Sequence, residues 1–302
     1  MKIKLDLLAL IPTILFSTGC NKKMKSVNVI ILSGQSNAVG CKASVNLINS
    51  MGQEAYDRFS KGFEDIKIAY NNWTVSDYFV NPHPMELQNS SKKGKFEKVQ
   101  LGQGNTKDNF GPEIGIADEL HDKWGKKLYI IKVASGGSNL NDDWAQDTDE
   151  MFKTLVSFVD KRMSELEEEG LKPYLRAFCW MQGEGDSYPG YADVYDLNLE
   201  SLKRNLDRAF LKYTENNNLP FIDAGIGPGY HPDTGKNEWE LYEKVNQCKK
   251  DFALQSPTNI YFDTIEAGLH SNQEPNDDVH YDSESQVKLG HLFAQNLEQF
   301  LK

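Results

Sequence analysis

Cysteine is scarce in this chain, with four in 302 residues. Three of them, Cys41, Cys179 and Cys248, are widely spaced and form no Cys-x-x-Cys pair, which argues against a metal cluster. Because three is an odd number, only one pair of them could form a disulfide. We therefore expect buried or free thiols and no metal site.

Positive charge is also in deficit. The chain has 33 Lys and Arg residues against 44 Asp and Glu residues, a formal net charge of −11. A protein that binds phosphate backbones needs a basic face, so we expect no nucleic-acid partner. Hydrophobic residues make up 39% and charged residues 25% of the chain. These proportions are ordinary for a globular protein and exclude a disordered chain, a collagen-like repeat and a coiled coil.

Hydrophobic runs long enough to span a membrane are missing from the sequence, since a span takes about 20 residues. The apolar run at residues 7–16 follows Lys2 and Lys4 and leads through small residues to Cys20. This succession of charged, apolar and small residues is typical of a secretory signal.

The end of this segment, Thr18-Gly19-Cys20, resembles a bacterial lipobox, although Ser17 stands where an apolar residue is usual. The resemblance implies that residues 1–20 are a lipoprotein signal peptide ending at a lipidated Cys20, and that residues 21–26 are a tether. It also implies an exported bacterial lipoprotein of the cell envelope, periplasmic or surface-facing, with a lipid anchor as its only membrane contact. Ordinary cleavage beside an incidental cysteine is the alternative.

After the tether, short apolar runs alternate with helical patterns. Apolar runs, several rich in β-branched residues, predict buried strands at residues 27–33, 128–134, 174–181, 220–226 and 259–263. Helical patterns lie between or after them, at residues 112–124, 149–169, 191–213, 238–254 and 283–301. The alternation predicts an α/β domain over residues 27–302, with a parallel sheet covered on both faces.

Residues 64–110 do not follow this alternation. They are rich in Asn, Lys, Gly, Asp and aromatic residues, and they are long for a connection without periodicity. We expect an insertion that shapes one rim of a site, with a surface excursion of no function as the alternative.

Polar segments follow three of the predicted strands, where ligands of parallel α/β sheets bind. Ser33-Gly-Gln-Ser-Asn37 follows the first strand and places Ser36 on a tight turn into a helix. Helix N-terminal N–H groups could stabilise an oxyanion there, although a helix-capping serine is the simpler interpretation. Gly136 and Gly137 follow the second strand and let the backbone approach a ligand closely.

The third segment, Trp180-Met-Gln-Gly-Glu-Gly-Asp186, carries Gln182, Glu184 and Asp186 directly after a strand. A fourth segment precedes the last helix and pairs Asp277 with His280. In a turn, this spacing can bring the carboxylate to the imidazole Nδ1–H, which would orient the ring and stabilise its charged form. A surface pair is the alternative.

Together, Gly-Gln-Ser-Asn, Gly-Gly, Trp-x-Gln-Gly-Glu-x-Asp and the late Asp-x-x-His resemble the SGNH hydrolases. They are most similar to the branch of sialate O-acetylesterases and carbohydrate esterase family 6, in which Gln replaces the usual Asn, as Gln182 does here. Phe110-Gly-Pro-Glu-Ile-Gly-Ile-Ala117 resembles another segment of that branch. The resemblance implies a flavodoxin-like three-layer α/β/α sandwich around a parallel sheet of about five strands, with no metal and no cofactor.

The resemblance also implies roles for individual residues. Ser36 would be the nucleophile, His280 the general base and then acid, and Asp277 its orienting partner. The oxyanion hole would use Ser36, Gly136 or Gly137, and Gln182. Residues implied to support the site or the substrate are Gln35, Asn37, Glu113, Glu184 and Asp186. Asp278 follows Asp277 directly, so either could orient His280, and Glu184 or Asp186 is a further alternative.

The expected function is therefore a carbohydrate O-acetylesterase that releases acetate from acetylated sugars through an acetyl-enzyme. A glycan-binding lipoprotein without turnover, and a lipid esterase or thioesterase on the same fold, are the alternatives. Acetylated xylan, sialic acid and pectic glycans are all open as substrates. Aromatic residues that could stack on sugar rings are Trp73, Tyr78, Phe79, Trp144, Tyr188, Tyr191 and Tyr230.

Overall fold

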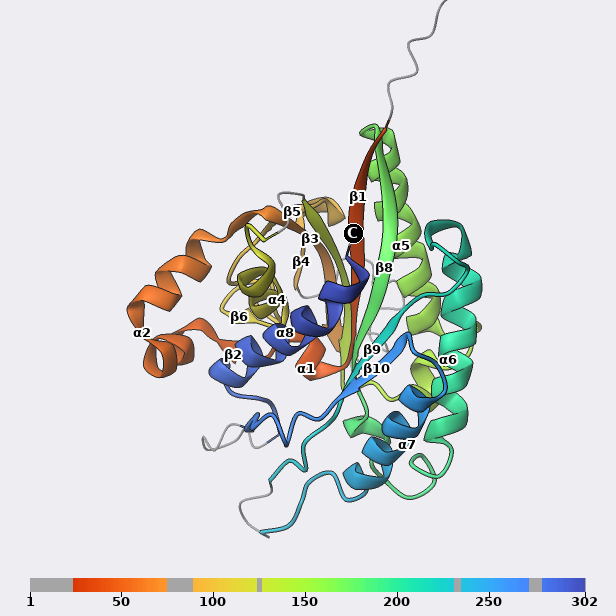
Figure 1. The fold of residues 1–302 in the computed structure, drawn as a ribbon. Coiled ribbons are helices and arrows are strands. Elements are labelled where there is room, and N and C mark those ends of the chain that lie inside the picture. Colours follow the sequence, from red (N-terminus) through yellow and green to blue (C-terminus); the bar gives the residue numbers. More distant parts are fainter. Residues whose placement is uncertain (1–23, 75–88, 124–126, 231–234, 272–278, 302) are drawn as a thin grey trace, which may run out of the picture.

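A computed structural model describes residues 24–74, 89–123, 127–230, 235–271 and 279–301 of the chain. Its centre is an eight-stranded sheet in the order β10-β9-β8-β1-β7-β3-β4, with β5 paired to β3 (Figure 1). The six strands from β10 to β3 are parallel, whereas β4 and β5 run antiparallel to β3. The predicted α/β class with a mostly parallel sheet is confirmed.

The five predicted strands are all present in this sheet. They are β1 (Lys25–Gly34), β7 (Leu128–Gly136), β8 (Leu171–Met181), β9 (Phe221–Ala224) and β10 (Asn259–Phe262). From its third residue onward β1 is buried, and β7 is buried throughout, because helices cover both faces of the sheet. A strand buried on both faces needs a continuous apolar run, which is why these strands are legible in the sequence.

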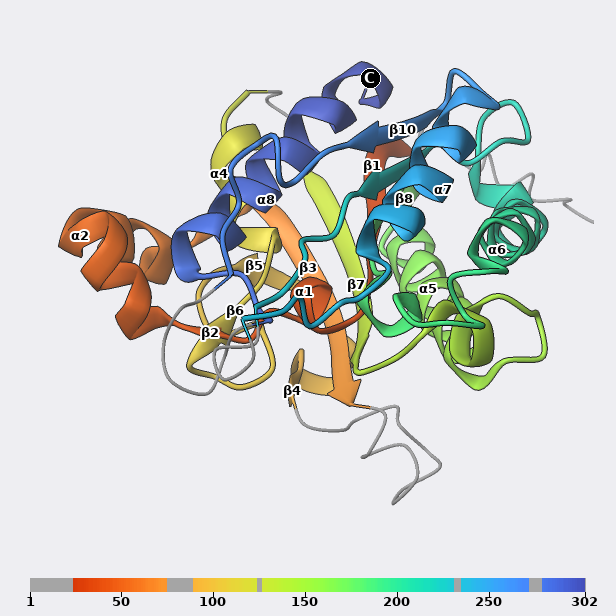
Figure 2. The same ribbon diagram turned by 90° about the horizontal axis from the view of Figure 1, so that it is seen from below.

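Helices cover the sheet on its two faces, as Figures 1 and 2 show. One face carries α2 (Ser44–Lys61), α4 (Glu113–Leu120) and α8 (Ser283–Leu297). The other carries α5 (Glu150–Glu168), α6 (Tyr195–Phe210) and α7 (Tyr242–Leu254). Phe293 of α8 packs on Phe262 of β10, and Phe252 of α7 packs on Phe221 of β9. Among the described residues, no helix has the length and hydropathy needed to cross a bilayer.

The prediction of an insertion over residues 64–110 was wrong for its first part. β3 (Phe63–Thr74) pairs in parallel with β7 along nine residues and is the sixth parallel strand of the sheet. Its alternation of apolar with charged residues at Ile66, Lys67 and Ile68 hid it from a search for continuous apolar runs. Residues 75–88 lie outside the described part. The remainder forms short strands: β4 (Asn89–Ser90), β5 (Glu97–Val99) and β6 (Asn109–Phe110), which pairs with β2 (Lys42–Ala43).

The order of the strands creates a switch point at β1. From β1 the chain first builds β3 and β7 on one side, and then β8, β9 and β10 on the other. The loops after β1, β7 and β8 consequently meet at the carboxyl edge of the sheet, where open α/β sheets bind ligands.

We expect Gly34→Ala to destabilise the fold strongly. Gly34 has a φ of +139°, and a Cβ atom there would lie 1.9 Å from the carbonyl oxygen of Met181 on the neighbouring strand. The free energy of unfolding, measured with denaturant, should fall by about 4 kcal/mol or more. Gly170→Ala is the matched control, because Gly170 also has a positive φ but nothing lies within 4 Å of its Cβ position. That control should lose only about 1–2 kcal/mol, and equal losses would contradict a steric constraint at Gly34.

Candidate active site

A cavity of about 520 Å³ lies at the carboxyl edge of the sheet, and it falls within the range of small-molecule sites. Ser36 and His280, which are far apart in the sequence, both line it together with Gly136 and Gly137. The remaining lining residues are Gln35, Val39, Cys41, Asn105, Trp239 and Val279. The structure therefore brings the predicted nucleophile, base and backbone donors to one cavity.

A sharp turn at the end of β1 presents Ser36. The Gln35 N–H donates to the carbonyl oxygen of Met181 at 3.0 Å, which holds β1 against β8 up to the turn. The short helix α1 (Ser36–Val39) follows, closed by hydrogen bonds from the Ala38 and Val39 N–H groups to the Gln35 carbonyl. Ser36 is half-buried at the start of this helix, where backbone N–H groups have no partner within the helix.

The backbone after β7 is open toward solvent. Gly136 ends the strand, and Gly137, which is exposed, has a φ of +76° with nothing within 4 Å of its Cβ position. Backbone without side chains at a cavity wall can offer its N–H groups to an oxyanion.

Asn37 joins three segments of the site. Its side-chain amide donates to Glu184 Oε1 at 2.8 Å, and its side-chain oxygen accepts from the Tyr281 N–H at 3.1 Å. The Gln286 amide donates to the Asn37 carbonyl at 3.4 Å. Asn37 thus fixes the residue after Ser36 to the loop after β8 and to the residue after His280.

Glu184 is buried in the loop after β8. One carboxylate oxygen accepts from Asn37, while the other, Oε2, has no hydrogen-bond partner among the described residues. Burial raises the pKa of Glu184, and the Asn37 hydrogen bond and the charges of Lys249 and His280 act against this rise.

Gln35 and Gln182 form a buried polar network behind the site. The side-chain oxygen of Gln35 accepts from the N–H groups of Gly183 and Gly185 at 3.3 and 3.1 Å, and from the Gln182 amide at 3.3 Å. The Gln182 amide also donates to Asp186 at 2.5 Å. Gln182 is fully buried and does not line the cavity, and both its N–H groups have acceptors. Its predicted role as an oxyanion donor stays a prediction, and it requires the amide to leave one of these acceptors.

Asp186 supports the neighbouring loop. Its carboxylate accepts from the Leu140 N–H at 2.7 Å and the Asn141 N–H at 3.2 Å, at the start of the helical segment Leu140–Trp144. Burial raises its pKa to about 6, although these hydrogen bonds and that from Gln182 favour the charged form. Glu184 and Asp186 both stay alternatives for the acid that orients His280.

Glu113 supports the opposite wall. It forms a fully buried ion pair with Lys132 at 2.7 Å, and Lys132 donates to the carbonyl oxygens of Val39 and Gln103. Lys132 comes from β7 and Val39 ends α1, so this pair fixes the helix that carries Ser36 to the sheet. Its role in supporting the site stays a prediction.

Comparisons with known proteins bear on these features. A model of the family described as "carbohydrate esterase, sialic acid-specific acetylesterase" matches residues 26–299. The chain belongs to this family. Its members are carboxylic ester hydrolases, so the expected enzyme class is confirmed. No curated protein sequence matches the chain.

Solved structures similar to this esterase include NanS, a protein from Arabidopsis thaliana and a carbohydrate acetylesterase from Xanthomonas citri. NanS is 12% identical to this chain in sequence, with a TM-score of 0.60. The match covers 92% of this chain and 98% of NanS. The Arabidopsis protein is 19% identical with a TM-score of 0.59, covering 91% of this chain and 99% of that protein. The Xanthomonas enzyme is 16% identical with a TM-score of 0.56, covering 90% of this chain and 56% of that enzyme. At these identities the similarity shows the shared fold.

Several predicted residues lie outside the described part of this esterase. They include Asp277 and Asp278, so the choice of acid that orients His280 stays a prediction, and Cys20, so lipidation does too. Tyr78 and Phe79 also lie there. Trp144 was wrong as a sugar-stacking candidate, because it is fully buried and packs against Trp180 in the core.

Trp239 was missed by the sequence analysis. It lines the cavity and packs edge-to-face against Tyr188, one of the predicted aromatics, with ring centroids 6.1 Å apart. Nothing local marks it, because it lies in the connection between β9 and α7 without a recognisable motif. Asn105 and Cys41 also reach the cavity from segments that carried no signal.

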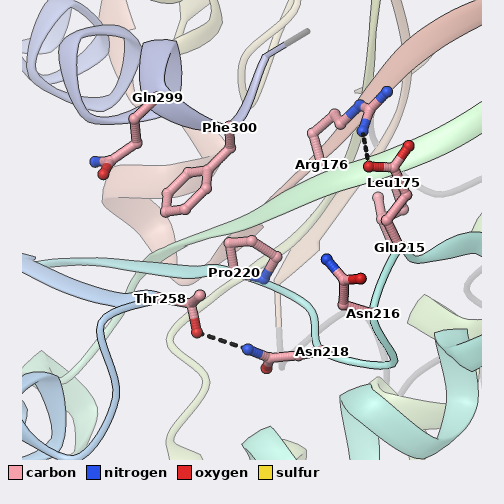
Figure 3. A pocket seen from close by; sticks show the side chains of 9 residues that line it. All are labelled: Leu175, Arg176, Glu215, Asn216, Asn218, Pro220, Thr258, Gln299 and Phe300. Atoms are coloured by element: carbon pink, nitrogen blue, oxygen red, sulfur yellow. Dashed lines mark hydrogen bonds and ion pairs between the residues drawn. The ribbon is translucent and has the colours of Figure 1, made fainter.

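A smaller hollow of about 210 Å³ lies at the opposite, amino edge of the sheet (Figure 3). Its charged side chains pair with each other, Arg176 with Glu215 at 3.1 Å, and the Asn218 amide donates to the Thr258 hydroxyl at 2.7 Å. None of the predicted site residues lines it. The predicted chemistry is therefore confined to the carboxyl edge.

A separate cluster of potential metal ligands, Asp65, His121 and Asp122, also lies away from the cavity. His121 Nδ1 lies 2.6 Å from Asp65 Oδ1, and the Asp122 N–H donates to Asp65 Oδ2 at 2.9 Å. These contacts tie the end of α4 to β3. His121 Nε2 also lies 3.1 Å from the Asp122 carboxylate, so each group has a partner without an ion.

We expect Gln182→Ala to lower the free energy of unfolding by about 1–3 kcal/mol, because buried groups of Gln35, Asp186 and Tyr195 would lose a partner. Denaturant unfolding and kcat should be measured on the same variant. Tyr195→Phe is the control, since it removes the hydroxyl that donates to Gln182 and leaves the ring in place. A Gln182→Ala protein as stable as wild type, with kcat about 10²–10³-fold lower, would instead identify a dedicated oxyanion donor.

Proposed function

We propose that this esterase is a serine hydrolase that releases acetate from O-acetylated sugars through an acetyl-enzyme on Ser36. The observation that carries the proposal is the single cavity lined by Ser36, His280, Gly136 and Gly137. A nucleophile, a base and backbone donors around one space are the components that acyl transfer needs.

In the proposed first step, Ser36 Oγ attacks the acetyl carbonyl carbon and His280 accepts the hydroxyl proton. The carbonyl oxygen becomes an oxyanion, which the N–H groups of Ser36 and of Gly136 or Gly137 stabilise. When the C–O bond to the sugar breaks, His280 returns the proton to the sugar oxygen. Water then attacks the carbonyl carbon of the acetyl-enzyme while His280 accepts its proton. The bond from Ser36 Oγ to that carbon breaks, His280 returns the proton to Oγ, and acetate leaves.

A carboxylate should stabilise the charged imidazole while His280 holds the proton. Asp277 has the spacing for this role in the proposal, with Asp278 beside it in the sequence. Glu184 contributes in this proposal as a buried carboxylate that is held by Asn37. In this arrangement Glu184 is a positioning residue that acts through His280 and Asn37.

We expect Ser36→Ala to lower acetate release by about 10⁴-fold or more while leaving the unfolding transition unchanged, because the nucleophile is lost and a half-buried hydroxyl adds little stability. Acetate should be measured from an aryl acetate and from a panel of acetylated sugars and glycans. Ser50→Ala is the matched control, since among the described residues its hydroxyl bonds only within α2. A Ser36→Ala protein with wild-type turnover would overturn the serine mechanism.

A folded wild-type protein that binds glycans and releases no acetate from any of these substrates would favour the binding-only alternative. Release from long-chain acyl esters in preference to acetates would favour the lipid esterase alternative. The aryl acetate and the sugars together separate these outcomes from the proposed activity.

We also propose that the chain is exported and anchored in the cell envelope through a lipid on Cys20. The sequence of residues 1–20 supports this, and the fold is compatible, since β1 begins at Lys25, only a few residues after Cys20. β1 runs for ten residues to the switch point, a distance of about 30 Å at the rise of a β-strand. An anchor at the amino edge would therefore leave the cavity facing away from the membrane.

We expect Cys20→Ala to abolish lipid attachment and move the protein from the detergent-rich to the aqueous phase in Triton X-114 partitioning of expressing bacteria. Metabolic labelling with a fatty acid should give the same result. Cys41→Ala is the matched control, because Cys41 belongs to the folded domain and should not affect partitioning. Wild-type protein found only in the aqueous phase and unlabelled would contradict the anchor.

A further inference from the structure

We infer that Lys132 is a positioning residue for the reaction: its buried ammonium group holds the end of the one-turn helix that carries Ser36 and joins that helix to the loop that carries Asn105. Lys132 does not line the cavity, so it acts through the backbone of these two segments. The inference rests on the proposed acetylesterase activity and adds to its site a residue that no sequence motif indicated.

The helix that carries Ser36 depends on contacts from outside itself. α1 has only four residues, and its N-cap residue, Gln35, makes no side-chain capping hydrogen bond. A single helical turn is unstable in isolation, because ordering its backbone costs more free energy than its few hydrogen bonds contribute. The carbonyl groups at the end of a helix also lack partners within it, and Val39 ends α1.

Lys132 supplies the contact at this end. Its ammonium group donates to the Val39 carbonyl at 2.7 Å, to the Gln103 carbonyl at 3.0 Å and to Glu113 Oε2 at 2.7 Å. An ammonium group has three N–H donors, so all of them are used. The side chains of Lys132 and Glu113 have no exposed surface, and these bonds therefore compete little with water.

The same ammonium group joins two parts of the cavity wall. Ser36 and Asn105 both line the cavity. Lys132 reaches the first through the end of α1 and the second through Gln103, two residues before Asn105. The Asn105 N–H donates to the carbonyl of Gly40 at 2.8 Å, directly after α1. The bonds of Lys132 thus help to set the separation between the predicted nucleophile and this loop.

Close packing around Gly111 holds the ammonium group in one place. The Gly111 N–H donates to Glu113 Oε1 at 2.8 Å, which orients the carboxylate toward Lys132. A Cβ atom on Gly111 would lie 2.8 Å from Glu113 Oε2, 2.9 Å from Lys132 Nζ and 3.0 Å from the Val39 carbonyl oxygen. The backbone therefore encloses this cluster without room for a further side chain.

Glu113 has a separate task in this arrangement, which is to keep Lys132 charged. Burial lowers the pKa of Lys132, and the charge of Glu113 acts against this fall. Of the described carboxylates, Glu113 alone forms an ion pair with Lys132. A neutral amine has one N–H donor fewer, so one of the three acceptors would lose its bond. The other titratable groups that face this cluster are Cys41 after α1, Tyr70 beside Lys132 on β3, and Glu97 of β5, which accepts from the Gln103 side chain.

The test compares Lys132→Met, alone and combined with Glu113→Gln, with wild type on an aryl acetate. We expect kcat to fall about 10²-fold with little change in KM, because a small displacement of the nucleophile slows the chemical step. Amide hydrogen exchange of residues 35–41 should become faster in the same variants. Lys203→Met is the matched control, since Lys203 is a buried lysine of α6 that pairs with Asp207 and does not line the cavity. It should keep wild-type kcat.

A pH profile separates this role from a merely structural one. In Glu113→Gln, the pKa of Lys132 should fall further, so the ammonium group loses its proton as the pH rises. We expect kcat of this variant to fall with rising pH over a range in which wild-type kcat is level. The double variant Lys132→Met/Glu113→Gln should show no such fall, because it has no lysine to titrate.

A folded double variant with wild-type kcat would overturn the inference, as would an equal loss of kcat in Lys203→Met. A pH profile of Glu113→Gln parallel to that of wild type would overturn it too. If Lys132→Met alone fails to fold because it leaves Glu113 buried without its partner, the double variant and the pH profile decide. Wild-type protein that releases no acetate from the aryl acetate would instead refute the proposed function on which the inference rests.

Discussion

The side-chain amide of Asn37 is the contact on which the geometry of this site depends. It holds Glu184 of the loop after β8 and the backbone of Tyr281, and it is adjacent to Ser36 in the sequence. The predicted nucleophile and base come from opposite ends of the chain, and parallel strands alone would not set their separation. Because Asn37 is buried, its hydrogen bonds compete little with water, and breaking them would leave polar groups unpartnered.

Polar groups surround this contact in a layer that is unusual for a protein core. The Gln182 amide donates to the side-chain oxygen of Gln35 beneath the turn. The Lys132–Glu113 pair fixes the end of α1 from the other side. Buried charges and amides contribute little net stability compared with apolar packing, because removing them from water is costly. They do restrict the backbone to one arrangement, and a site that stabilises a transition state requires such preorganisation.

Strands that are buried on both faces could be predicted from the sequence, whereas a strand with one partly exposed face could not. Runs such as β1 and β7 are continuous and apolar, whereas β3, with Lys67 between two isoleucines, gave no such run and was taken for an insertion. For the site, motifs next to strand ends pointed to Ser36 and the glycines, which line the cavity. They could not show that Gln182 bonds to Gln35, or that Trp239 lines the cavity, because both depend on contacts between distant segments.

The most direct test of the central claim is to identify the acyl-enzyme itself. Rapid acid quenching during turnover of an aryl acetate, followed by digestion and mass spectrometry, reports which residue carries an acetyl group. The account predicts one added acetyl group on the peptide that contains Ser36, which disappears when the substrate is exhausted and is absent in Ser36→Ala. An acetyl group that turns over on another residue, or rapid acetate release without any acetylated peptide, would contradict it.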